Sequence, residues 1–394
     1  MKRILYISHR IPYPPNKGDK IRSFHEIRSL SSEYKIDLVT FVDSKTDNTY
    51  KTFLTGYCHE IHTFYINKAI GIICALFFFI LGRSLSEGYY FNIRAFFRIR
   101  SLINSKEYEA IFCYSAQVAQ YVLAYNNRKR IMDFVDVDSD KWKQYSTKMK
   151  FPLRIIYKIE SRRLLNFEKI ISNRFSMSFF STDLESKLFK DYGAEGEIFV
   201  VNNGVDSEYF QPVDTEKEQA LVFIGAMDYY PNIDAVTWFI NEVFFILLKQ
   251  LPDLKFYIVG SNPSKEVYDL MNLNPNIIVT GYVEDVRPFL SKSRLAVLPI
   301  RIARGIQNKI LEAMAMAIPV VVNEKLYASL SNLNRNDVFI YKDAEDLSKI
   351  ILDNIGNENR LIQIGNKMRK YILEYYSWDF HLNMLKDYIK QIEV

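Results

Sequence analysis

Residues 294–323, RLAVLPIRIARGIQNKILEAMAMAIPVVVN, contain the pattern that decides the fold. The short apolar run 294–300 is followed by a basic loop that contains a glycine. A Met- and Ala-rich stretch with helical character then begins near Lys309, and the valine-rich run 318–323 ends the segment. A buried strand, a loop, a helix and a second buried strand make a βαβ unit, so the two strands are expected to be parallel.

The same alternation extends through the chain in two series. The first series comprises the apolar runs 3–8, 36–42, 110–115, 129–137 and 175–182, and the second comprises 220–226, 255–261, 277–283, 294–300 and 318–323. Helical patterns separate these runs, which predicts an α/β protein with two parallel-sheet domains. The expected divisions are residues 1–205, residues 206–377, and a C-terminal helix in 378–394 that packs back on the first domain.

The composition favours a folded protein in a reducing compartment. Of the 394 residues, 48% are hydrophobic and 25% are charged, as in globular proteins with a sizeable core. Cys58, Cys74 and Cys113 show no C-x-x-C spacing, so neither a disulfide framework nor a zinc site is expected. The net charge is only +5, and no nucleic-acid partner is expected. The apolar residues near the N-terminus indicate a first buried strand rather than a signal peptide.

One apolar run has two interpretations. Residues 69–82, AIGIICALFFFILG, are shorter than the roughly 20 residues needed to span a bilayer. The following stretch, GYYFNIRAFFRIR, alternates arginines with aromatic residues, which suits a helix lying in a membrane interface. Residues 90–175 also contain 17 Lys and Arg against 8 Asp and Glu. The alternative is a buried helix packed against a sheet, with solvated basic helix faces.

The loop before Lys309 has the features of an anion-binding site. A glycine in this loop permits a tight turn, and the N–H groups at the start of a helix are available to an anion. Arginine and lysine side chains supply positive charge, and a carboxylate one turn further can accept hydrogen bonds from a diol such as ribose. The residues concerned are Arg301, Arg304, Gly305, Ile306, Gln307, Asn308, Lys309 and Glu312. The alternative is an ordinary helix start with solvated charges.

The segment LEAMAMAIPVVV and its preceding turn resemble the nucleotide-sugar site of family-4 glycosyltransferases, which have the GT-B fold. Further segments resemble other blocks of that family: IFVVNNGVDSEYFQP, FIGAMDYYPNIDAVTWF, KFYIVGSNP, IIVTGYVEDVRPFL and YYSWDFHLNMLKDYI. The N-terminal SHRIPYPPNKGDKIRSFHEIRSL, together with DFVDVDSDKW and RIARGIQNKILEAMAM, most resembles a subfamily of sugar transferases associated with exopolysaccharide gene clusters. The resemblance implies two Rossmann-like domains facing a central cleft, with acceptor bound by the first and donor by the second.

The resemblance also implies roles for individual residues. Glu312 matches the second Glu of the family's Glu-x7-Glu pair, which holds the donor ribose, whereas Arg304 stands where the first Glu is usual. The segment FIGAMDYYPN lacks the basic residues that many members carry there, so the positive charge that stabilises the leaving diphosphate is expected at Arg301, Arg304 and Lys309. Gly18, Gly225 and Gly260 are the remaining residues expected at the donor.

Asp138 is the remaining expected catalytic residue. It lies in DFVDVDSDKW, and we interpret Asp136 and Asp138 as groups near the reacting sugar or the acceptor. The alternative is a strand-end cluster that caps the next helix. The Asp-x-Asp spacing also occurs in metal-bound sites of another glycosyltransferase fold, but the resemblance implies no metal, no cofactor, and retention of the anomeric configuration.

The expected activity is transfer of a hexosyl group from a UDP- or GDP-linked sugar to a glycan or lipid-linked acceptor in exopolysaccharide biosynthesis. The expected location is the cytoplasm, with possible peripheral contact at the inner face of the cytoplasmic membrane. Two alternatives are a nucleotide-sugar epimerase or hydrolase on the same fold, and a non-catalytic module that binds nucleotide sugars.

Overall fold

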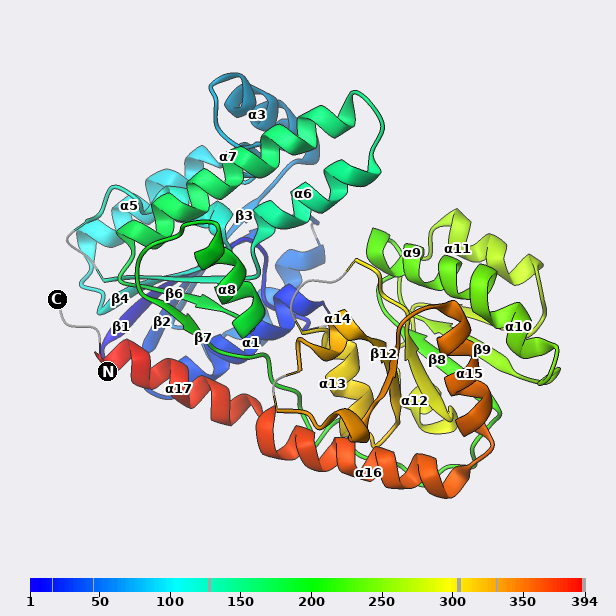
Figure 1. The fold of residues 1–394 in the computed structure, drawn as a ribbon. Coiled ribbons are helices and arrows are strands. Elements are labelled where there is room, and N and C mark those ends of the chain that lie inside the picture. Colours follow the sequence, from blue (N-terminus) through cyan, green and yellow to red (C-terminus); the bar gives the residue numbers. More distant parts are fainter. Residues whose placement is uncertain (16, 45, 127–128, 303–305, 331, 392–394) are drawn as a thin grey trace. The chain divides into compact units, whose positions relative to one another are not determined.

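The computed structural model describes residues 1–391 except 16, 45, 127–128, 303–305 and 331. The chain forms two compact units (Figure 1). Unit 1 comprises residues 1–202 together with the C-terminal segment from residue 381, and unit 2 comprises residues 203–380. Each unit is a parallel sheet covered by helices, so the α/β prediction is confirmed.

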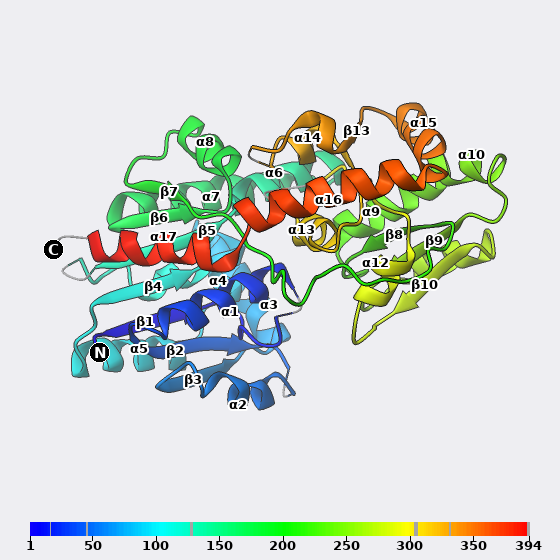
Figure 2. The same ribbon diagram turned by 90° about the horizontal axis from the view of Figure 1, so that it is seen from below.

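Unit 1 contains a seven-stranded parallel sheet in the order β3-β2-β1-β4-β5-β6-β7 (Figure 2). Its strands are β1 (Arg3–Ser8), β2 (Lys35–Val42), β3 (Glu60–Tyr65), β4 (Ala110–Tyr114), β5 (Arg130–Val135), β6 (Met177–Phe180) and β7 (Ile198–Val200). Its helices are α1 (Gly18–Leu30), η1 (Thr46–Tyr50), α2 (Lys51–Leu54), α3 (Lys68–Ile80), α4 (Leu85–Tyr89), α5 (Ile93–Ser105), η2 (Ala116–Tyr121), α6 (Asp138–Lys148), α7 (Leu153–Arg174), α8 (Asp183–Asp191) and most of α17 (Trp378–Gln391).

Side chains alternate between the two faces of this sheet, as the strand period requires. Leu5 and Ile7 of β1 pack in a core that also contains Ala95 and Ile99 of α5, together with residues of α7. Tyr6, between them, points to the other face and donates a hydrogen bond to Glu26 of α1. Figure 1 shows α5 and α7 on one side of the sheet and α1 and α17 on the other. Both faces are therefore covered, as in doubly wound folds.

Unit 2 contains a six-stranded parallel sheet in the order β10-β9-β8-β11-β12-β13. Its strands are β8 (Ala220–Ile224), β9 (Lys255–Val259), β10 (Ile277–Gly281), β11 (Leu295–Leu298), β12 (Val320–Asn323) and β13 (Phe339–Tyr341). Its helices are α9 (Tyr230–Phe239), η3 (Ile240–Phe244), α10 (Phe245–Leu248), α11 (Lys265–Asp269), η4 (Leu270–Asn272), α12 (Arg287–Lys292), α13 (Asn308–Ala315), α14 (Glu324–Tyr327), η5 (Arg335–Asp337), α15 (Ala344–Ile355) and α16 (Glu358–Tyr375).

The ten strands expected from the apolar runs are all present, each within three residues of the expected ends. Three further strands, β3, β7 and β13, were not expected. The β3 sequence, EIHTFY, is mixed in polarity and mostly half-buried, and β7 and β13 have three residues each. Short or mixed edge strands do not form the continuous apolar runs that mark the centre of a parallel sheet.

Two apolar helical segments differ in how they are covered. Residues Tyr230–Leu248, which comprise α9, η3 and α10, are long and apolar enough to cross a membrane by length and composition alone. Half of this segment is buried, and Phe239, Ile240 and Phe244 are among the fully buried residues of the unit 2 core. It is therefore a core helix. In contrast, α3 buries only Gly71, Ala75 and Phe78, so the expectation of a buried helix at 69–82 is wrong.

Candidate functional site

The strand order of unit 2 reverses between β8 and β11. The connection after β8 leads to β9 on one side, and the connection after β11 leads to β12 on the other. Ligands of open α/β sheets bind at the carboxyl ends of the strands next to such a reversal. The loop after β8 contains Gly225, and the loop after β11 leads into α13, so both segments of the expected donor site lie at this position.

Two glycines allow the backbone loops to approach each other here. Gly260 has φ +153°, and a Cβ atom placed on it would lie 1.7 Å from the carbonyl oxygen of Gly225. A Cβ on Gly225 would lie 2.6 Å from Asn232 Nδ2 and 2.8 Å from Lys309 Nζ. Gly260 is therefore required by the packing of the two loops, and Gly225 leaves space for the Lys309 ammonium group.

Lys309 extends from the first turn of α13 to the loop after β8. Its Nζ donates a hydrogen bond of 2.6 Å to Asn232 Oδ1, and Asn232 Nδ2 in turn donates to the carbonyl of Ala226. The same Nζ lies 4.4 Å from the centre of the Phe223 ring, a cation–π distance. The ammonium group is thus held in place between α13 and the residues that follow β8.

Burial perturbs the pKa values of both Lys309 and Glu312, which are half-buried. Burial lowers the pKa of Lys309 to about 7, although the charge of Glu312 opposes the shift. Burial likewise raises the pKa of Glu312 to about 7, against the influence of Lys309. Burying charged groups is costly unless each is paired and hydrogen-bonded. An anion at Lys309 and hydroxyl donors at Glu312 would therefore stabilise the charged forms.

The start of α13 has the extended backbone of an ordinary helix N-cap. Gln307 is the N-cap, with extended φ −91° and ψ 115°, and its side chain makes no capping hydrogen bond to the described helix. Asn308 accepts from Asn203, and its own Nδ2 is buried with no acceptor among the described residues. The side chain of Ile306 packs in the core of unit 2. The expected residues Arg304 and Gly305 lie outside the described part of the chain.

Arg301 has a partner that its sequence context does not indicate. Its Nε and Nη2 bind both carboxylate oxygens of Asp234 on α9, at 3.1 and 2.6 Å. The guanidinium also lies 5.7 Å from the centre of the Trp238 ring. This bidentate ion pair occupies two nitrogens of the guanidinium group. Arg301 therefore joins the loop after β11 to α9.

Unit 1 has its own reversal between β1 and β4. Two residues that follow β1 contact the same carboxylate: His9 Nε2 lies 3.3 Å and Arg10 Nη1 lies 3.2 Å from Asp19 Oδ2. The His9 ring also stacks on the Tyr114 ring, with 5.9 Å between the ring centres. Burial alone would raise the pKa of Asp19, but the hydrogen bond from His9 and the charge of Arg10 outweigh it and lower that pKa. The expected Gly18 is the exposed first residue of α1, next to Asp19.

The Asp138 side chain lies at the same edge of the sheet. It is half-buried in the first turn of α6 and accepts a hydrogen bond of 3.0 Å from Gln117, which follows β4. Asp136 accepts from Ser181 at 2.9 Å, and burial raises the pKa of its carboxyl. Neither carboxylate is the N-cap of α6, which is Val137. The helix-capping alternative for these two residues is therefore wrong.

A buried ionic network lies beneath α1. Arg22, 1% exposed, contacts Asp133 Oδ2 at 2.7 Å and Glu26 Oε1 at 3.1 Å, and it donates to the carbonyl of Val201 at 2.7 Å. Burial raises the pKa of Glu26 well above its usual value, and the neighbouring Asp133 adds to this effect. The network thus joins α1 to β5 and to the residue after β7. Asp133 is the main counter-charge of Arg22.

A cavity of about 220 Å³ opens beside the β1–α1 loop. Three cationic residues line it, together with two aspartates, one serine and four apolar or aromatic residues: Arg10, Lys17, Lys20, Asp43, Asp47, Ser44, Ile11, Pro14, Phe41 and Tyr50. It lies at the carboxyl ends of β1 and β2, the edge at which ligands of such sheets bind.

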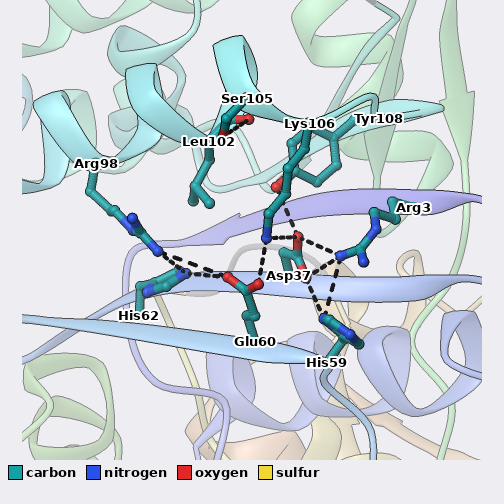
Figure 3. Close-up of polar contacts among 10 residues, drawn as sticks. All are labelled: Arg3, Asp37, His59, Glu60, His62, Arg98, Leu102, Ser105, Lys106 and Tyr108. Carbon is teal, nitrogen blue, oxygen red and sulfur yellow. Dashed lines mark hydrogen bonds and ion pairs between the residues drawn. The ribbon is translucent and has the colours of Figure 1, made fainter.

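One cluster of donor atoms has the spacing of a metal site, but cations already neutralise it (Figure 3). Asp37, His59 and Glu60 lie together at the amino ends of β2 and β3. Lys106 Nζ lies 3.1 Å from Asp37 and 2.5 Å from Glu60, and Arg3 also binds Asp37. The network joins β1, β2 and β3 at the edge opposite the ligand-binding one, so it is a stabilising contact.

Sequence reasoning missed three side chains that position the expected ones. Asn232 holds Lys309, Asp234 holds Arg301 and Gln117 holds Asp138. Asn232 and Asp234 stand within FIGAMDYYPNIDAVTWF, a segment that was singled out without separating these two residues. Both are polar residues at the start of an otherwise apolar helix, and this feature of the sequence could have identified them.

Comparisons with known proteins agree with this architecture. Residues 218–357 match the family model described as glycosyl transferases group 1, a span that includes Gly225, Lys309 and Glu312. The chain is 22% identical over 390 residues to an uncharacterized 44.6 kDa protein in the cps region of Klebsiella pneumoniae, covering 95% of this chain and 97% of that protein.

Two solved structures have the same fold over the whole chain. HepE of Anabaena, in complex with UDP and glucose, superposes with a TM-score of 0.71 at 13% identity and 100% coverage of both chains. TarM, known from S. aureus, superposes with a TM-score of 0.71 at 14% identity and 99% coverage of both. The two parallel sheets match the GT-B fold of these structures, and residues 218–357 are similar to the glycosyl transferases group 1 family.

Proposed function

We propose that the protein is a retaining glycosyltransferase that moves a hexosyl group from a UDP- or GDP-linked sugar to a glycan or lipid-linked acceptor in exopolysaccharide biosynthesis. Support for the reaction class comes from the glycosyl transferases group 1 match over residues 218–357. A relative in a cps region supports the pathway, and HepE, which binds UDP and glucose, supports a nucleotide sugar as donor. The proposed location is the cytoplasm, at the inner face of the cytoplasmic membrane.

The observation that carries the proposal is the half-buried pair of Lys309 and Glu312 at the start of α13. Both groups have pKa values shifted to about 7, which makes their charged forms costly in the absence of a ligand. A nucleoside diphosphate offers the complementary chemistry, because its phosphates are anions and its ribose hydroxyls are donors. Lys309 would neutralise the diphosphate, while Glu312 would accept hydrogen bonds from the ribose.

The reaction itself requires a cation at this position. When the bond between the sugar and the phosphate breaks, negative charge develops on the diphosphate and the sugar gains oxocarbenium character. Lys309 Nζ is held by Asn232 and Phe223, so it is oriented before the charge develops. Preorganised groups of this kind stabilise a transition state without reorganisation. The N–H groups at the start of α13 would add to this stabilisation.

In this proposal the acceptor binds to unit 1. Asp138, oriented by Gln117, would hold an acceptor hydroxyl or contact the transferred sugar. The cavity beside the β1–α1 loop, lined by Arg10, Lys17 and Lys20, would receive the more distant part of the acceptor. Gly18 would leave the start of α1 accessible to an anionic group of the substrate.

A panel of nucleotides and nucleotide sugars tests the proposal. A ligand present at about 100 times its Kd stabilises a protein by about 2.7 kcal/mol, so UDP- or GDP-sugars should raise the Tm whereas the free sugars should not. The product formed with the selected donor then separates the reaction classes. Transfer to an acceptor with retained configuration supports the proposal, whereas release of free sugar or an epimer supports the alternative enzyme.

The Glu312→Gln variant tests the site assignment. It should weaken nucleotide binding while leaving the Tm of the unliganded protein nearly unchanged. Glu345→Gln, at an exposed position on α15, is the matched control. Equal nucleotide affinity in both variants would remove Glu312 from the donor site, and a protein that binds donors without any turnover would be a binding module.

A further inference from the structure

The α3 helix is attached to unit 1 by one face only. Its buried residues, Gly71, Ala75 and Phe78, pack against α4. A Cβ atom on Gly88 of α4 would lie 2.6 Å from the carbonyl oxygen of Cys74, so this glycine permits close contact between the two helices. Asn67 caps the start of α3 by accepting from two backbone N–H groups. The helix is therefore well anchored, and its remaining surface is available to another partner.

The other face of α3 is apolar and exposed. Ile80 is 82% exposed, and the neighbouring large side chains are each about half exposed or more: Ile70, Ile72, Ile73, Leu76, Phe77 and Leu81. Apart from Lys68 at its start, the helix contains no charged residue. Helices that are hydrophobic all round are normally buried, and a contiguous exposed patch of this kind marks an interaction surface.

A second exposed group lies at the turn between α6 and α7. Phe151 is 79% exposed, and Leu153 and Ile155 are also exposed. The basic residues Lys150 and Arg154 alternate with them and are exposed as well. Aromatic and aliphatic side chains interleaved with cations are typical of segments that insert into a headgroup region.

The two groups belong to one rigid part of unit 1. Glu160 of α7 accepts hydrogen bonds from the N–H groups of Leu85 and Ser86 at the start of α4. Arg163, one turn further, donates to the carbonyl of Phe79 at 2.5 Å. With a rise of about 1.5 Å per residue, Leu153, the first residue of α7, lies roughly 10 Å along the helix from Glu160. Figure 1 shows α3 and the α6–α7 turn at the same edge of unit 1.

The charge around this surface is positive. Residues 66–105 and 141–163 contain only two acidic residues, Glu87 and Glu160, and both are buried. Glu87 pairs with Arg83 at 2.6 Å, and Glu160 is satisfied by the start of α4. The exposed charges of these segments are therefore all cationic, and they include Lys68, Arg94, Lys150, Arg154, Lys158 and Arg162.

We infer that the exposed face of α3 and the α6–α7 turn dock the protein on the surface of an anionic phospholipid bilayer. Thirteen residues of helix span about 20 Å, too short for the roughly 30 Å hydrocarbon core, so α3 lies in the interface rather than across it. The cations would bind lipid phosphates while the apolar face enters the acyl boundary. A second copy of the chain fits this surface poorly, because two basic rims would face each other.

This inference deepens the membrane location in the proposed function, and vesicle binding measured without donor or acceptor tests it separately. The full chain should sediment with vesicles of phosphatidylcholine and phosphatidylglycerol, and much less with phosphatidylcholine alone or at high salt. The variant Ile73→Glu/Phe77→Glu/Ile80→Glu should bind at least about a hundredfold more weakly, because three apolar side chains no longer enter the membrane. Replacing Lys150, Arg154 and Lys158 with Ser should weaken binding by about fivefold per residue.

Ile362→Glu/Leu373→Glu, at exposed positions of α16 in unit 2, is the matched control and should bind vesicles like the unaltered protein. Undiminished vesicle binding by the α3 variant would overturn the inference. The inference would also be overturned if the unaltered protein did not bind vesicles and instead formed a dimer, measured by sedimentation velocity, that the α3 substitutions dissociate. If the α3 variant loses vesicle binding and keeps turnover on a water-soluble acceptor, docking and catalysis are separate. Vesicle binding by a protein that turns over no donor would leave docking intact and refute the proposed reaction.

Discussion

The two strand reversals of the molecule differ in how one pair of their charged side chains is satisfied. At the unit 1 reversal, buried or half-buried charges have partners within the unit: Asp19 pairs with His9 and Arg10, and Arg22 pairs with Asp133. At the unit 2 reversal, Lys309 and Glu312 have pKa values shifted to about 7 by burial, which their mutual attraction does not offset.

Under the proposed function, this difference separates charges that stabilise the fold from charges that bind a ligand. In a buried ion pair with good geometry, the attraction between the partners offsets their desolvation, and removing one partner is strongly destabilising. When burial shifts both pKa values of a pair, the desolvation of the charged forms is not offset inside the protein, and a bound ligand can offset it. Such groups are concentrated at functional sites. Substitutions in the two reversals should therefore differ in kind, with stability affected in unit 1 and ligand binding in unit 2.

The largest effect is expected from Arg22→Met. Loss of the cation leaves Asp133 buried without compensation, which should reduce the free energy of unfolding of unit 1 by about 3–5 kcal/mol. Native-state hydrogen exchange in β1 and β5 measures this change. Glu26→Gln is the control, because the raised pKa of Glu26 favours its neutral form, of which Gln is a close mimic. A loss as large in Glu26→Gln would show that Glu26 is ionised in the folded protein.

Lys309→Met should lower turnover by about 10²–10³, the usual cost of removing one preorganised group that stabilises developing negative charge. Unfolding should change little, because the side chain loses an unfavourable buried charge along with its hydrogen bond to Asn232. Steady-state kinetics with the selected donor measures the effect. Lys249→Met, exposed after α10, provides the comparison. Similar kinetics in both variants would rule out Lys309 as the phosphate-binding cation.

Nucleotide affinity should be highest near pH 7 and fall by up to about tenfold per pH unit on either side. Above the lowered pKa of Lys309 its positive charge is lost, and below the raised pKa of Glu312 the carboxylate becomes protonated. Calorimetric titration of the selected UDP- or GDP-sugar, whose diphosphate does not titrate in this range, from pH 5.5 to 8.5 at about half-unit steps measures this profile. Glu312→Gln should remove the acidic limb only, and an acidic limb that persists in this variant would contradict the assignment.

The smallest effect is expected from Arg301→Met. Because the guanidinium is already bound to both carboxylate oxygens of Asp234 and is nearly half exposed, nucleotide affinity should change by less than about threefold. Asp234→Asn should have an effect of similar size. A tenfold or greater loss in Arg301→Met alone would mean that Arg301 leaves Asp234 to bind the donor, as its sequence context suggested.

The strands could be located from the sequence because central strands of a parallel sheet are buried on both faces. The run ALVFIGA, for example, contains β8 (Ala220–Ile224). The edge strand β3 could not be located in this way, since Glu60 and His62 alternate with apolar residues and belong to a polar network. The exposure of α3 could not be inferred either, because an apolar sequence is compatible with burial in protein or in lipid.

The sequence by itself predicted where the candidate site begins, because a basic, glycine-containing loop between a buried strand and a helix has the local features expected of an anion site. Only the tertiary structure decided which of its charges remain for a ligand. Asn232 is 77 residues from Lys309, and Asp234 is 67 residues from Arg301. The reversal of strand order brings α9 beside the loop after β11. Ion pairing and desolvation depend on distances of a few ångströms, and the fold sets those distances.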